Sequence, residues 1–235
     1  MLSRVLVKLS GEGLAGGAGF GIDPATLKQT AMEIAAAATV VQLSLVVGGG
    51  NLFRGASDDG LAAVGLDRVT GDQMGMLATL INALAFRDAL AAVGTDAVVL
   101  ASHAIPSVAE GYSVQKAVGH LEAGKVVVHA GGTGNPLFTT DTAACLRGIE
   151  TGAEVIVKAT KVDGVYSADP VSHPDAERFD ELTYTEVLDR QLGVMDLTAI
   201  TLCLEHRMPV VVCDATRPGT LTRIVRGAKV GTRIS

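Results

Sequence analysis

The feature that most constrains the fold is a repeated succession of a short apolar run, a glycine-rich turn and a helical segment. The short runs consist mainly of Val, Leu, Ile and Ala. Continuously apolar strands that alternate with helices are typical of a parallel sheet covered by helices on both sides. The sequence therefore predicts an α/β fold, a three-layer αβα sandwich around a mainly parallel central sheet. We expect strands at residues 2–9, 43–47, 97–101, 125–130, 154–159 and 209–213, and a short strand at the end of the chain.

Several helical segments have a recognisable start. Asp23 followed by Pro24 predicts an N-cap and a first helical position, and this helix is expected to run to about Val41. The stretch 163–183, rich in Pro and Asp, predicts a hairpin or a lid. We find no internal repeat and no long polar linker, so residues 1–235 are expected to form a single domain. Other helices are expected at residues 67–90, 113–122 and 139–148, as two short segments before residue 209, and from about residue 219.

Glycine-rich turns follow four of the expected strands, at residues 10–13, 48–50, 131–134 and 160–164. Ligands of open α/β sheets bind at the carboxyl ends of the strands, so these turns should share one edge. Four such turns imply a large ligand or two ligands side by side. After the third turn, two threonines and Asp141 open a helix, whose free N–H groups and dipole favour an anion. A carboxylate beside a bound anion needs a cation, which indicates chemistry rather than binding alone.

Composition excludes several classes of function. The net charge is −6, aromatic residues make up 3% of the chain and Trp is absent, so we expect no nucleic-acid partner and no membrane partner. The first residues lack the apolar core of a signal peptide, and the apolar run 31–47 is too short to cross a bilayer. We therefore expect a cytoplasmic protein. The three cysteines lie in apolar contexts without metal-ligand spacing, which predicts free thiols and no protein-held metal: Cys145, Cys203 and Cys213.

One motif points to a function that its context does not support. Gly11, Gly13 and Gly16 match the dinucleotide fingerprint G-x-G-x-x-G after a strand. The acidic residue required after the second strand is missing, because that strand runs into Gly48–Gly50. Further glycines are expected to keep the chain loose until Asp23. No Walker A motif occurs either, so we exclude a dinucleotide-binding dehydrogenase and a P-loop enzyme.

Two cations beside the turns suggest phosphate chemistry. Lys8 ends a buried strand, where an ammonium is costly unless it meets an anion or solvent. Arg54 follows three consecutive glycines, which exceed the need of a tight turn, and a guanidinium there suits the oxygens of a phosphate. Phosphoryl transfer requires mainly positioning and the neutralisation of charge. Lys8, Arg54, backbone N–H groups and a metal carried on a nucleotide would supply both.

Together these motifs resemble the bacterial UMP kinases of the amino acid kinase superfamily over nearly the whole chain. The segments that carry the resemblance are 8–12, 48–55, 71–77, 132–141 and 158–166, of which the first and fourth are the most specific. The resemblance implies the amino acid kinase fold. It also implies reversible transfer of the ATP γ-phosphoryl group to UMP, which gives UDP and ADP in pyrimidine nucleotide (CTP) biosynthesis. Mg²⁺ carried with ATP is the implied cofactor.

The resemblance assigns roles to particular residues, with the UMP-binding elements mainly in 1–150 and the ATP-binding elements mainly in 151–235. Asp141 would orient Lys8 and the transferring phosphate, and Asp72 is suited to accept a hydrogen bond from a hydroxyl of UMP. The implied catalytic residues are Lys8, Arg54 and Asp141. The implied ATP-binding residues are Lys8, Leu9, Ser10, Gly11, Gly50, Arg54, Thr160, Tyr166 and Asp169. The implied UMP-binding residues are Gly49, Asp72, Thr133, Gly134, Asn135, Pro136, Leu137, Phe138, Thr139 and Thr140.

The resemblance also implies a homohexamer and control by effectors, with GTP as activator and UTP as inhibitor. The corresponding effector loop consists of Gly16, Gly17, Ala18, Gly19, Phe20 and Gly21. The sequence leaves open whether Lys158 or Lys161 points inward. It also leaves open whether Asp196, an N-cap candidate for a helix at 197–204, has a catalytic role. Two alternatives remain: another enzyme of the amino acid kinase superfamily, or a relative that stores oxyanions without catalysis.

Overall fold

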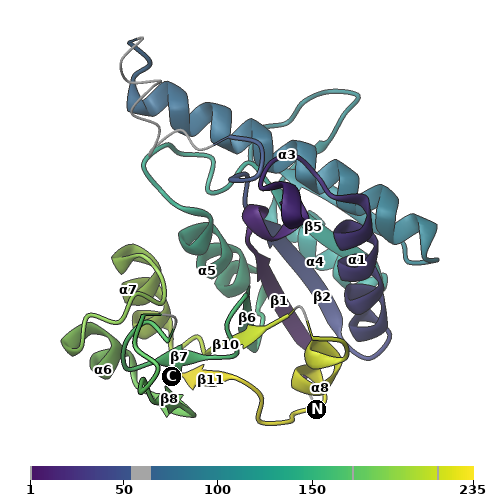
Figure 1. The fold of residues 1–235 in the computed structure, drawn as a ribbon. Helices are drawn as coiled ribbons and strands as arrows, with labels where there is room; N and C mark the ends of the chain where they lie inside the picture. Colours follow the sequence, from purple (N-terminus) through teal and green to yellow (C-terminus); the bar gives the residue numbers. More distant parts are fainter. Residues whose placement is uncertain (1, 54–64, 171, 216) are drawn as a thin grey trace.

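The computed structural model describes residues 2–53, 65–170, 172–215 and 217–235, and Figure 1 shows their arrangement. Within these ranges, a nine-stranded sheet has the order β4-β3-β5-β2-β1-β6-β10-β11-β9. Neighbouring strands pair in parallel except β10 and β11, which are antiparallel. The strands of this sheet are β1 (Arg4–Leu9), β2 (Gln42–Val47), β3 (Ala97–Ala101), β4 (Glu110–Gly111), β5 (Val126–Ala130), β6 (Val155–Thr160), β9 (Glu181–Leu182), β10 (Val210–Asp214) and β11 (Thr232–Ile234).

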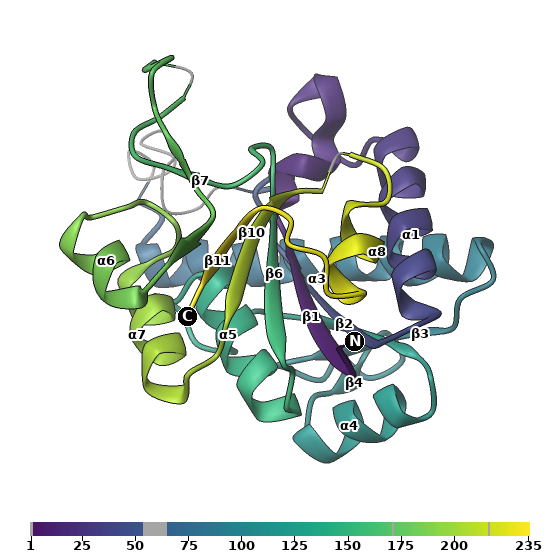
Figure 2. The same cartoon turned by 90° about the horizontal axis from the view of Figure 1, so that it is seen from below.

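Helices cover both faces of the sheet, which confirms the predicted three-layer α/β sandwich. One face packs against α1 (Pro24–Ala38), α3 (Arg68–Ala92) and α8 (Thr220–Val225). The other face packs against α4 (Val114–Glu122), α5 (Thr140–Thr151), α6 (Tyr184–Asp189) and α7 (Leu197–His206). In Figure 1, β1 and β2 lie between α5 and α1. Both views place α6 and α7 on the opposite side of the molecule from α1 and α8 (Figure 2).

Successive side chains of a strand point to opposite faces of the sheet, so the position of a residue along its strand decides which core it enters. Val5 and Val7 of β1 belong to the core beneath α1 and α3, whereas Leu6 belongs to the core beneath α5. Lys8 shares the parity of Leu6 and therefore projects toward α5. The same rule places Lys158 of β6 on that face, because Ile156 two residues earlier packs there.

The capping predictions are confirmed for two helices. Asp23 accepts a hydrogen bond from Thr26 N at 2.7 Å, with Pro24 as the first residue of α1. Asp196 accepts from Ala199 N at 3.0 Å and caps α7. Each cap satisfies a backbone N–H that has no partner within the helix. The long helix α3 is capped in the same way by Asp67.

Three local expectations differ from the structure. The chain after β1 is not loose, because Gly11–Ala18 forms a 3₁₀ segment, η1, with a break at Gly16, where φ is 55°. The first helix ends at Ala38, before the expected Val41. The short strands β4 and β9 lack the apolar runs by which strands were recognised, so they were not predicted. For the stretch 163–183 the hairpin alternative is confirmed, since β7 (Val165–Tyr166) pairs antiparallel with β8 (Arg178–Phe179).

The helix α3 is long and apolar enough, by length and composition alone, to cross a membrane. Core helices of globular proteins meet the same criteria. The apolar residues Leu80, Phe86 and Leu90 are buried in the core that α3 forms with β3 and β5. This packing accounts for the apolar residues on the side of α3 that faces the sheet.

Candidate active site

Three charged side chains form a cluster where β1 and β6 meet the start of α5. Lys8 and Lys158 are paired neighbours in the parallel register of β1 and β6. Asp141 lies between them, with Oδ1 2.8 Å from Lys8 Nζ and Oδ2 2.7 Å from Lys158 Nζ. The three side chains are only 11–15% exposed. The sequence left open whether Lys158 or Lys161 points inward, and the structure shows that Lys158 does.

The cluster keeps Asp141 ionised and leaves an excess of positive charge. Burial alone would raise the pKa of Asp141, but the charges of Lys8 and Lys158 outweigh it and hold the pKa below its usual value. Burial lowers the pKa of Lys158, and the nearby Lys8 charge acts in the same direction against the attraction of Asp141. The Lys158 ammonium also donates to the carbonyl of Val194. Two cations against one carboxylate can stabilise a further anion.

A second carboxylate, Asp196, ties the start of α5 to α7. Thr139 caps α5 by accepting from Asp141 N at 3.0 Å, and its hydroxyl donates to Asp196. The Thr142 hydroxyl donates to Asp196 Oδ1 at 2.9 Å. Asp196 therefore helps to fix the helix turn that carries Asp141, in addition to capping α7. The sequence showed the capping pattern, but not this contact across 54 residues.

Glycines allow the first two turns to touch. A Cβ on Gly11 would lie 2.6 Å from the Gly48 carbonyl oxygen and 2.7 Å from Gly50 N. A Cβ on Gly49 would lie 2.8 Å from the Gly75 carbonyl oxygen of α3. Close packing of backbones thus explains why the turn 48–50 contains more glycine than its shape requires. The turns that follow β1 and β2 lie together at one edge, as predicted.

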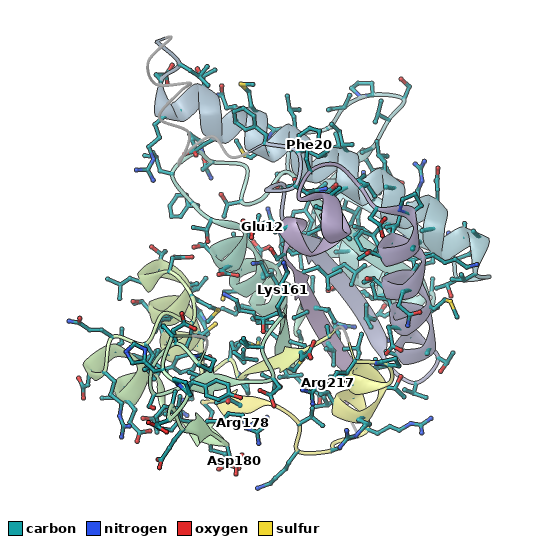
Figure 3. The ribbon with its side chains drawn as sticks, viewed as in Figure 1. Glu12, Phe20, Lys161, Arg178, Asp180 and Arg217 are labelled. Carbon is teal, nitrogen blue, oxygen red and sulfur yellow. The ribbon has the colours of Figure 1, made fainter. Side chains whose placement is uncertain are left out.

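A cavity of about 750 Å³ opens beside the lysines, between η1, α1 and the end of β6. Figure 3 places Glu12 and Lys161 near the centre of the molecule, and both line the cavity. Its volume is within the range of small-ligand pockets. The lining residues are Lys8, Leu9, Ser10, Glu12, Gly13, Leu14, Gly16, Ala25, Thr26, Gln29, Thr30, Glu33, Lys158, Ala159, Thr160, Lys161 and Ala215.

The hairpin residues expected to bind ATP lie apart from this lining. The Tyr166 hydroxyl donates to Asp163 Oδ1 at 2.7 Å, and this bond raises the pKa of Tyr166. Asp169 is exposed and accepts from the Ser172 hydroxyl at 3.0 Å. Neither residue is among the described residues that line the cavity. Figure 3 shows Arg178 and Asp180 together on the same hairpin.

The loop 131–139 leads into α5, whose first turn carries Asp141. Asp72 of α3 reaches the loop, and its Oδ2 accepts from Leu137 N at 2.8 Å. Leu137 itself has a φ of 73°, an unusual backbone conformation for a leucine, and its side chain is exposed together with that of Phe138. The structure therefore brings Asp72 to the expected UMP-binding residues. Arg54, expected at the transfer site, lies outside the described residues.

The sequence reasoning missed a buried amide pair behind the glycine turns. Asn82 of α3 donates to the Gly48 carbonyl at 2.7 Å and to Asn51 Oδ1, also at 2.7 Å. Asn51 in turn donates to Asn82 and to the Gly21 carbonyl. The pair joins the second turn to α3 and to the loop 16–21. The available signal was an asparagine at position 82, within the otherwise apolar face of a long helix.

Comparisons with known proteins match this chain and its fold to one family. The sequence profile described as "Amino acid kinase family" matches residues 3–214. The chain is 57% identical to "Uridylate kinase" of Pseudomonas syringae pv. syringae (strain B728a) over 98% of this chain and 93% of that protein. Its fold resembles the crystal structure of UMP kinase from Bacillus anthracis, with a TM-score of 0.95, 36% identity and coverage of 100% and 96% of the two chains. The uridylate kinase of Archaeoglobus fulgidus gives a TM-score of 0.76 at 28% identity, over 99% of this chain and 100% of that chain.

Proposed function

The chain belongs to the amino acid kinase family, and we propose that it is a UMP kinase, which transfers the γ-phosphoryl group of ATP to UMP and yields UDP and ADP. The reaction is reversible and supplies pyrimidine nucleotides for CTP synthesis. The observation that carries this proposal is the Lys8–Asp141–Lys158 cluster, because both lysines line a nucleotide-sized cavity and Asp141 lies in the first turn of the helix that follows the loop 131–139. One nucleotide in the cavity and one at the loop could therefore share the same pair of ammonium groups.

The chemistry follows from this geometry. Two phosphate groups repel one another, and Lys8 and Lys158 offset that repulsion where the γ-phosphoryl group moves. The second pKa of a phosphate monoester is about 6, so the UMP phosphate is mainly a dianion at neutral pH. Its attack on the γ-phosphoryl group therefore needs no general base. Asp141 lies between the two lysines, which lower its pKa and keep it ionised, so its role is to align them. Arg54 would add a further cation at the transfer site.

The cavity takes ATP and the loop 131–139 takes UMP. Lys8 to Gly11 and Gly50 would contact the ATP phosphates, and Thr160 the adenosine, with Tyr166 and Asp169 approaching from the hairpin. Asp72 of α3 and Gly49, which packs against α3, would contact UMP together with Thr133 to Thr140. This arrangement keeps the acceptor in residues 1–150, whereas the cavity proposed for ATP is lined by residues 8–33 as well as by residues 158–161 and Ala215. It is supported by the positions of Lys8 to Ser10 and Thr160 in the cavity lining and by the hydrogen bond from Leu137 N to Asp72.

Mg²⁺ would arrive with ATP. The described residues contain no group of three or more His, Cys, Asp or Glu side chains that could hold a metal ion. Mg²⁺ keeps several waters and binds mainly through substrate phosphates, with one or two carboxylates from the protein. Glu12, which lines the cavity, would be a carboxylate near those phosphates. When bound, the ion neutralises charge on the β- and γ-phosphate oxygens.

Assembly and control complete the proposal. The exposed side chains of Met74, Leu77 and Ile81 follow helical spacing along α3, and such an apolar stripe supports a contact between copies in a homohexamer. The loop 16–21, with its 70% exposed Phe20, would receive effectors, with GTP activating and UTP inhibiting. Three buried free thiols support a reducing, cytoplasmic setting.

One assay separates this function from its rivals. ADP release from Mg-ATP is measured with UMP, CMP, glutamate and aspartate offered in parallel. We expect release with UMP only. Release with glutamate or aspartate instead would identify another enzyme of the superfamily. Absence of release with all four acceptors would favour oxyanion storage.

A further inference from the structure

A buried arginine beneath the loop 131–139 has no part in the chemistry described so far. The side chain of Arg147 on α5 is only 7% exposed. A buried charge is costly unless it is paired and its donors are hydrogen-bonded. The surroundings of Arg147 meet both conditions, because Glu150 supplies the countercharge and the loop accepts a hydrogen bond.

The countercharge comes from the same helix. Arg147 Nη1 lies 2.7 Å from Glu150 Oε2. The Tyr112 hydroxyl donates to that same oxygen at 2.6 Å, and the guanidinium lies 3.9 Å from the centre of the Tyr112 ring. These contacts fix the plane of the guanidinium and direct Nη2 toward the carboxyl ends of β3 and β5.

The Nη2 donors reach the loop directly and through one hydroxyl. Nη2 donates to the Thr133 carbonyl at 3.4 Å and to Ser102 Oγ at 3.2 Å. Ser102 Oγ in turn donates to the Gly132 carbonyl at 2.8 Å. In a trans peptide the C=O and the following N–H point in opposite directions. Because the Gly132 carbonyl points toward Ser102, the N–H of Thr133 points away from the arginine cluster.

The helix α5 connects this support to the transfer site. Asp141 lies in its first turn and holds Lys8 and Lys158, while Arg147 follows six residues later. Side chains on a helix lean toward its N-terminus, so Arg147 reaches back to the loop that precedes α5. One rigid element thus sets the positions of both the transfer lysines and the turn 131–134.

We propose that Arg147 is a positioning residue for the acceptor nucleotide, which acts by fixing the Gly132–Thr133 peptide through Ser102 and the Thr133 carbonyl. The inference rests on the proposed function, because it assigns the loop 131–139 to UMP. A lysine at position 147 would keep the charge opposite Glu150. Its single ammonium lacks the planar fork that reaches Glu150, Ser102 and Thr133 together.

The test is a comparison of the KM for UMP with the KM for ATP. Initial rates are measured for the wild-type protein, Arg147→Met, Arg147→Lys and Ser102→Ala, each substrate being varied while the other is saturating. We expect Arg147→Met to raise the KM for UMP about tenfold and Ser102→Ala about threefold, since each removes hydrogen bonds that hold the loop. The KM for ATP should change less than about twofold. Arg147→Lys should lie between wild type and Arg147→Met.

The matched control is Arg190→Met. Arg190 also places its guanidinium over an aromatic ring, 5.2 Å from the centre of Phe179, but it lies at the end of α6 and pairs with Glu186 of that helix. The variant Arg190→Met should leave both KM values unchanged. In the double variant Arg147→Met/Ser102→Ala the two effects should not add, because both residues act on one peptide.

Several outcomes would overturn the proposal. Equal increases in both KM values would indicate general structural damage, and an unchanged KM for UMP in Ser102→Ala and Arg147→Lys would remove the positioning role. Those two variants decide the matter if Arg147→Met does not fold. A wild-type protein that releases no ADP with UMP would instead contradict the proposed function itself.

Discussion

Replacing His129 by leucine should change how the stability of the protein depends on pH. His129 lies on β5 and is 3% exposed. Neither ring nitrogen has a hydrogen-bond partner within the described part of the chain. The edge of its ring meets the Tyr112 ring at a centroid distance of 5.5 Å. Burial, and to a lesser extent the charge of Arg147, lowers the pKa of His129 to about 3.

The sign and size follow from this shift. In the unfolded chain the histidine has a pKa of about 6.5, so between pH 6.5 and 3 the unfolded state binds a proton that the folded state does not. Stability is therefore fully present above pH 6.5 and falls as the pH is lowered through that window. Each pH unit is worth about 1.4 kcal/mol, which gives about 2 kcal/mol between pH 6.5 and 5. His129→Leu should remove this loss.

The free energy of unfolding is measured by urea denaturation of wild type and His129→Leu at pH 5, 6, 7 and 8, at one protein concentration. We expect the leucine variant to gain about 2 kcal/mol relative to wild type between pH 7 and pH 5. The exposed His103, replaced by leucine, serves as the control and should retain the wild-type slope. If His129→Leu and wild type lose stability in parallel down to pH 5, the reasoning is refuted.

Three further predictions concern the site. Lys8→Ala should lower kcat by a factor of about 10² or more, because it removes one of the two ammonium groups at the moving phosphoryl, whereas the urea midpoint should change little, since Lys158 still pairs with Asp141. Asp72→Ala should raise mainly the KM for UMP in steady-state assays, because Asp72 holds Leu137 N in the loop 131–139. Gly11→Ala should lower the thermal midpoint and the activity together, because its Cβ would lie 2.6 Å from the Gly48 carbonyl oxygen.

Each of these has a defined contrary outcome. Near-normal turnover of Lys8→Ala would remove the lysine from the mechanism. An effect of Asp72→Ala confined to the KM for ATP would mean that the two subsites are exchanged. For Gly11→Ala the matched control is Gly13→Ala in the same 3₁₀ segment, where a Cβ would meet no atom within 4 Å and stability should be unchanged or slightly higher. Equal losses in both variants would contradict the packing argument.

Local patterns in the sequence determined the elements and their class. The apolar strands, the Asp23–Pro24 start and the Asp196 cap depend on residues that are neighbours along the chain, so their physical cause is visible in the sequence. Alternation of strands and helices predicted the parallel sheet, and hence the shared edge of the turns at its carboxyl ends. The family resemblance rested on the segments around those turns and on residues 71–77 of α3.

Only the tertiary structure decided which distant residues meet. Lys158 was indistinguishable from Lys161 in the sequence, and it reaches Asp141 because β6 lies beside β1 in a register that pairs it with Lys8. The contact of Gly11 with Gly48 and the reach of Arg147 to Thr133 likewise depend on strand order and on the direction of α5. Strand order is set by the packing of whole layers, whereas a sequence pattern specifies the period of each element and not its neighbour.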